Sequence, residues 1–78
     1  MRVQFLGKDP ESSDTNSPTL FATDRQDRTS YLVQGWRVTD PEALAGVGDI
    51  PAHEAIVEIP AEIIDLAIRH RQEQEGTS

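Results

Sequence analysis

The chain lacks the residues that several functional classes need. It contains no cysteine, which excludes a disulfide framework, a thiolate metal site and a cysteine nucleophile. No apolar run approaches the roughly 18 residues that a membrane span requires. The opening residues 1–4 do not resemble a signal peptide, so we expect a cytoplasmic protein without a membrane partner.

Basic residues are also scarce. Seven Lys and Arg stand against fourteen Asp and Glu, which gives the 78-residue chain a formal net charge of −7. A molecule of this charge repels a phosphate backbone, so we expect no direct binding to nucleic acid. Hydrophobic residues (36%) and charged residues (27%) occur in the proportions of a small globular protein. A chain this short is near the lower limit for a single hydrophobic core, and forming a homodimer would add burial.

Strands are predicted at residues 2–6, 18–23, 30–38 and 54–59. The segment 30–38 is the strongest, because it combines β-branched and aromatic residues that are apolar on both faces. We expect it to be a central strand, with both faces covered or one face left exposed, and Gly35 marks either a bulge or a close approach by another backbone. Residues 8–17 are rich in Pro, Ser, Asp and Asn and predict an exposed, mobile loop.

Two helices complete the expected fold. Asp40 and Pro41 favour a short helix that stops at Gly46, and Pro60 precedes a longer amphipathic helix from Ala61 to about Gln74. The fold class is therefore α+β, with a small antiparallel sheet of three or four strands and a C-terminal helix packed on one face, in the order β-β-β-α-β-α. We expect one domain over residues 1–75 and a disordered tail at 76–78. The predicted core comprises Val3, Phe5, Leu20, Phe21, Leu32 or Val33, Val38, Leu44, Val57, Ile59, Ile63, Leu66 and Ala67.

The motifs of common catalytic and cofactor sites are missing. Gly46-Val47-Gly48 lacks the third glycine of a dinucleotide fingerprint and the long helix that should follow. His53-Glu54 begins like a zinc-protease motif, but Val57 stands where the second histidine would be. We therefore predict no enzyme activity, no cofactor and no metal. A small-molecule or metal site built on His53 and nearby carboxylates is the weakest hypothesis.

The single tryptophan suggests a binding surface. Two-residue alternation places Leu32, Gln34, Trp36 and Val38 on one face of the strand 30–38. Tryptophan is enriched at the energetic centres of protein interfaces, so these four residues are the candidate partner-binding site. The alternative is that Trp36 fills the core of a small domain. A protein partner or a second copy of the chain would occupy an exposed patch.

Three segments, 18–24, 31–38 and 40–44, resemble a family of short uncharacterised actinobacterial proteins that are often encoded near helix-turn-helix regulators. The resemblance extends from Phe5-Leu6-Gly7 to Glu58-Ile59-Pro60. It implies a regulatory accessory whose partner is a transcriptional regulator, and it implies no catalytic residue. A non-enzymatic protein-interaction module is the first hypothesis. An acidic decoy or antitoxin-like protein that neutralises a basic DNA-binding partner is the alternative.

Overall fold

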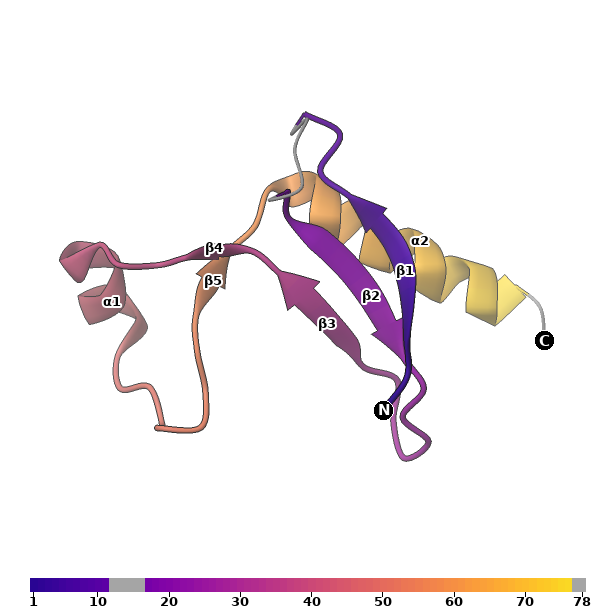
Figure 1. The fold of residues 1–78 in the computed structure, drawn as a ribbon, viewed down its shortest axis with the longest axis horizontal. Coiled ribbons are helices and arrows are strands. Elements are labelled where there is room, and N and C mark those ends of the chain that lie inside the picture. The colour runs from indigo at the N-terminus through magenta and orange to yellow at the C-terminus, as the bar shows by residue number, and fades with distance from the viewer. Residues whose placement is uncertain (12–16, 77–78) are drawn as a thin grey trace.

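The computed structural model of the chain describes residues 1–11 and 17–76 (Figure 1). Three strands form an antiparallel sheet in the order β1-β2-β3: β1 (Val3–Lys8), β2 (Thr19–Thr23) and β3 (Tyr31–Gln34). Two short strands form a second antiparallel sheet, β4 (Trp36–Arg37) and β5 (Val57–Glu58). The helices are α1 (Pro41–Val47), between β4 and β5, and α2 (Ala61–Gly76) at the C-terminus.

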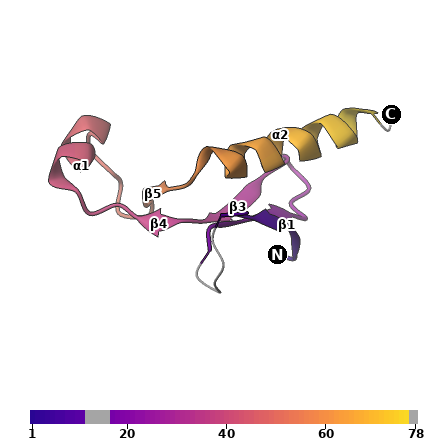
Figure 2. The same ribbon diagram turned by 90° about the horizontal axis from the view of Figure 1, so that it is seen from above.

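The predicted α+β class with a C-terminal helix on one sheet face is confirmed. Helix α2 packs on β1 and β2, and both helices lie on the same side of the strands (Figure 2). Leu20 and Ala22 of β2 are buried under α2, whose Ile63 is 1% exposed. These three side chains, with Pro18, form the centre of the core.

The predicted continuous strand 30–38 is wrong, and Gly35 is the reason. β3 ends at Gln34, and the chain resumes as β4 in the second sheet. The prediction of a central strand is also wrong, because β3 lies at the edge of the order β1-β2-β3. A Cβ atom at position 35 would lie 2.7 Å from the carbonyl oxygen of Glu58, which is closer than real Cβ atoms approach. The expected close approach of another backbone is thus confirmed, and β5 is that backbone. The predicted strand 54–59 is correspondingly reduced to Val57–Glu58.

The first strand contains a bulge that the sequence did not predict. Phe5 pairs with Phe21, but Gly7, rather than Leu6, pairs with the next residue, Leu20. Leu6 is therefore an extra residue on β1, and this changes the alternation of the strand. Gly7 faces α2, where an added Cβ would lie 2.8 Å from a methyl group of Leu66.

Both predicted helices are present, with later ends than expected. The carboxylate of Asp40 accepts a hydrogen bond from the backbone N–H of Glu42 at 3.4 Å, as an N-cap residue should. The helix α1 passes through Gly46 and ends before Gly48, whose φ of 92° suits glycine. Helix α2 continues to Gly76, so the predicted tail begins too early. Residues 77–78 of that tail lie outside the described part of the chain.

The predicted loop 8–17 is anchored at both ends. Lys8 belongs to β1, Asp9 is 4% exposed and Ser17 is 3% exposed. The backbone N–H of Asp9 donates to the carbonyl of Pro18 at 2.9 Å, which extends the β1–β2 pairing into the loop. The prediction of an exposed loop is therefore wrong at these ends. Pro10 and Glu11 are exposed, as predicted, and residues 12–16 lie outside the described ranges.

Much of the predicted core is exposed. Phe5 is 60% exposed, Val3 50% and Val57 39%, while Leu32 and Val33 are both exposed. The accessible surface of the chain is 6255 Å², whereas a compact monomer of this mass has about 4,700 Å². The radius of gyration, 14.4 Å, also exceeds the value of about 11.5 Å for a compact chain of this length. One layer of helix covers one side of the strands, and within residues 1–11 and 17–76 no second layer covers the apolar residues on the other side.

Candidate partner-binding surface

The face of the three-stranded sheet opposite α2, here called the open face, carries a row of large apolar side chains. Because Leu20 and Ala22 point toward α2, the intervening Phe21 points away from it. The register places Phe5 and Leu32 directly beside Phe21, one on each neighbouring strand. The rings of Phe5 and Phe21 lie 6.2 Å apart at 71°, an edge-to-face contact. Val3 continues the apolar surface along β1.

The centre of the open face is uncharged, although the chain carries fourteen carboxylates. Its strand residues by register are Val3, Phe5, Lys8, Thr19, Phe21, Thr23, Leu32 and Gln34, with the one charge, Lys8, at the end of β1. Phe5 (60% exposed), Val3 (50%) and Leu32 (45%) are its most accessible apolar side chains on paired positions. A contiguous apolar surface without charge at its centre is typical of protein interfaces.

Three of the four predicted site residues are exposed. Leu32 and Gln34 lie on the open face, and Trp36 is 44% exposed. Trp36 is therefore not the core residue of the alternative hypothesis. Only Gly35 separates β3 from β4, so Trp36 lies just beyond the end of the open face.

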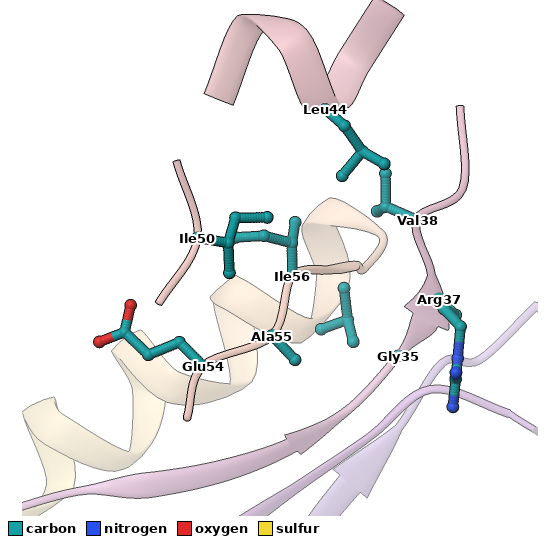
Figure 3. A pocket seen from close by; sticks show the side chains of 9 residues that line it. Gly35, Arg37, Val38, Leu44, Ile50, Glu54, Ala55 and Ile56 are labelled. Carbon is teal, nitrogen blue, oxygen red and sulfur yellow. The ribbon is translucent and has the colours of Figure 1, made fainter. Parts of the chain in front are cut away.

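Val38 lies apart from the other three. It follows β4 and points toward Leu44 of α1, next to Ile50 and Ile56 (Figure 3). These residues belong to a small projecting lobe, residues 36–58, and border an open cavity of about 410 Å³. The prediction that Val38 shares a face with Trp36 is wrong, because the strand ends at Arg37 and the chain turns toward α1.

Phe5 is exposed and Phe21 is half-buried, although the sequence predicts both in the core. Their alternation correctly predicted a strand with one apolar face. The signal that was overlooked is a shortage of covering elements, since one long helix can shield only one face of a sheet. With Leu20 and Ala22 already under α2, the opposite residues of β2 have no helix to contact.

The two histidines have different surroundings. Nδ1 of His70 lies 2.9 Å from the hydroxyl of Tyr31, and the two rings meet edge to face at 5.6 Å, which connects α2 to β3. His53 is 81% exposed in its side chain and lies 3.7 Å from the carboxylate of Glu54. Within residues 1–11 and 17–76, no three His, Cys, Asp or Glu side chains gather as a metal site would require. The described residues therefore provide no set of ligands for a metal bound by His53, which was the weakest hypothesis.

No helix in the described part of the chain is both long and apolar enough to cross a membrane. No protein-family model, curated protein or solved structure matches the chain. The candidate site therefore depends on the geometry of the open face alone, and the resemblance to regulator-linked actinobacterial proteins stays a hypothesis.

Proposed function

We propose that the protein is a non-enzymatic protein-interaction module that binds a protein partner through its open face. The observation that carries the proposal is the row Phe5–Phe21–Leu32 on a sheet face whose centre is uncharged, with the exposed Trp36 just beyond the end of β3. Aromatic side chains bury large apolar areas and lose little conformational entropy on binding, so they dominate binding energies at such surfaces. A regulatory accessory in the cytoplasm, with a transcriptional regulator as partner, is the role that we infer.

The acidic lobe supports the second candidate function, a decoy for a basic partner. Residues 36–58 contain five carboxylates and one arginine: Asp40, Glu42, Asp49, Glu54 and Glu58 against Arg37. Concentrated negative charge would attract the basic surface of a DNA-binding protein. This attraction is electrostatic and weakens as salt rises, whereas burial of the open face does not depend on salt in this way.

Affinity capture with variants tests the proposal. The tagged protein is incubated with lysate of its source cells, and bound proteins are identified by mass spectrometry. Trp36→Ala and Phe5→Ser remove apolar area from the open face. Val47→Ala is the matched control, because Val47 is 51% exposed but lies on α1, on the other side of the strands.

We expect one partner to be captured by the wild type and by Val47→Ala, and lost with both open-face variants. Capture should persist in about 0.5 M salt, where the Debye length is below 5 Å. A partner that binds all four proteins equally and is released by salt would replace the module with the acidic decoy. A partner retained by the open-face variants at high salt would refute both.

A further inference from the structure

The two edges of the three-stranded sheet differ in how they are protected. The outer strand β1 has a bulge at Leu6 and ends in Lys8, two features that hinder another strand from pairing there. The opposite edge is β3, whose residues Tyr31–Gln34 include no charge, no proline and no bulge. No described strand pairs with the outer side of β3. Its backbone N–H and C=O groups form a template for strand addition.

Apolar side chains accompany this edge on the helix side of the sheet. Val33 of β3 is 40% exposed, although it faces the side that α2 covers. Ile64 (51% exposed) and Ile68 (49%) lie one turn apart on α2 and share a helix face. The charged flank of α2, with Asp65 and Arg69, lies beside Lys8 of β1. The isoleucines occupy the other flank, which is directed toward β3.

The surplus surface of the chain indicates what covers this edge. Relative to a compact monomer of this mass, each chain exposes about 1,600 Å² too much. Two copies together have a surplus of about 3,100 Å², which accommodates a standard interface of about 1,600 Å² and still leaves both open faces accessible. The edge strand is uncharged, so the net charge of −7 is not concentrated where two copies would meet.

We propose that the protein is a homodimer in which β3 pairs antiparallel with β3 of a second copy, around a two-fold axis that passes through Leu32. The sheets join into one of six strands, with both α2 helices on the same side. With the axis at Leu32, Leu32 lies opposite the partner's Leu32 and Tyr31 lies opposite the partner's Val33. Directly opposite residues of an antiparallel pair point to the same face of the sheet. We centre the pairing on Leu32 rather than closer to Gly35, because β5 already approaches the chain at Gly35, beyond the far end of β3.

Apart from Leu32, which lies on the two-fold axis, the dimer and the proposed binding site use different groups. Its contacts are the backbone of β3 and the apolar flank of Val33, Ile64 and Ile68, while Phe5 and Trp36 remain accessible. The two open faces become one continuous surface, which presents the binding site twice with two-fold symmetry. Such a surface matches a partner that is itself a symmetric dimer.

Solution mass and one charge substitution test the interface. Sedimentation equilibrium should give twice the 8.6 kDa of the chain for the wild type, and 8.6 kDa for Ile68→Glu at the same concentration. Val47→Glu is the matched control, since Val47 is equally exposed but lies on α1, and it should remain dimeric. Circular dichroism establishes that each variant is folded. A wild-type mass of one chain across the micromolar range would overturn the proposal.

Engineered cysteines test the register. The chain has no cysteine, so any disulfide dimer reports a residue placed near its own symmetry mate. Directly opposite residues have Cβ atoms about 4.5–5.5 Å apart, so Leu32→Cys should cross-link on oxidation or with a short bismaleimide. Phe5→Cys lies two strands from the axis and should stay monomeric on a non-reducing gel. Cross-linking at Phe5 and not at Leu32 would indicate open faces stacked on each other, and would refute the edge pairing.

The two proposals can fail separately. If Ile68→Glu is monomeric and still captures a partner through Trp36, the binding module does not require the dimer. If the dimer forms and the open-face variants lose no partner, the interface is correct and the proposed function is wrong.

Discussion

Replacing Gly35 by alanine tests the connection between the two sheets. The added methyl group would lie 2.7 Å from the Glu58 carbonyl oxygen and 2.8 Å from Cγ2 of Ile59. Ordinary contact begins near 3.4 Å, and the first neighbour is backbone, which cannot rotate away. Either β5 moves away from β4 or β3 shifts against β2. Overpacking of this kind costs about 1–3 kcal/mol, which corresponds to a fall in Tm of about 4–8 °C per kcal/mol in a domain of this size.

The assay combines two signals at one fixed protein concentration. Circular dichroism during thermal unfolding follows the whole chain, and Trp36 fluorescence follows the β4–β5 pair, because Trp36 pairs with Glu58. Gly46→Ala is the control: a Cβ there meets nothing within 4 Å, and alanine should stabilise α1 by up to about 1 kcal/mol. We expect Gly35→Ala to lower Tm or to shift Trp36 emission to longer wavelength. If Gly35→Ala matches the wild type in both signals, the close approach of β5 does not hold the sheets together.

Two further substitutions test the core and the contact between α2 and β3. Ile63→Ala should lower the free energy of unfolding, measured with urea, by about 2–5 kcal/mol, because Ile63 is 1% exposed. Ile64→Ala, at 51% exposure, should lower it by less than about 1 kcal/mol in the isolated chain. Equal losses for the two variants would contradict the packing of α2. Tyr31→Phe should lower the free energy of unfolding by about 0.5–1.5 kcal/mol, because the hydroxyl contact with His70 is lost. In a chain that already carries His70→Ala, Tyr31→Phe should cause no further loss. Additive losses would mean that the two side chains act independently.

Local signals in the sequence predicted the helices better than the strands. Asp40, Pro41 and a glycine stop define α1 within one residue, because caps and proline act on neighbouring backbone groups. The position of Gly35 predicted a close backbone approach, and the structure confirms it. The backbone that approaches Gly35 is β5, which lies more than twenty positions away in the sequence, and its approach divides the predicted strand. The two-residue alternation of apolar residues does not report contacts between residues so far apart in the sequence.

In the candidate site, too, the sequence predicted local patterns better than contacts between distant elements. Alternation placed Leu32, Gln34 and Trp36 on one face, and all three are exposed in the structure. Val38 was misplaced because the strand ends one residue earlier, at Arg37. Phe5 was wrongly assigned to the core, since a strand pattern shows which residues share a face but not which face a helix covers.

The α+β class, the presence and starts of both helices, the lack of thiol chemistry and the acidic charge could all be inferred from the amino-acid sequence. These properties follow from composition and from interactions between residues a few positions apart. Only the tertiary structure decided that α2 covers Leu20 and Ala22 rather than Phe5 and Phe21, and that β3 rather than β1 has the unprotected edge. The physical reason is that burial depends on which elements meet in space. With one long helix for two apolar sheet faces, one face had to remain exposed.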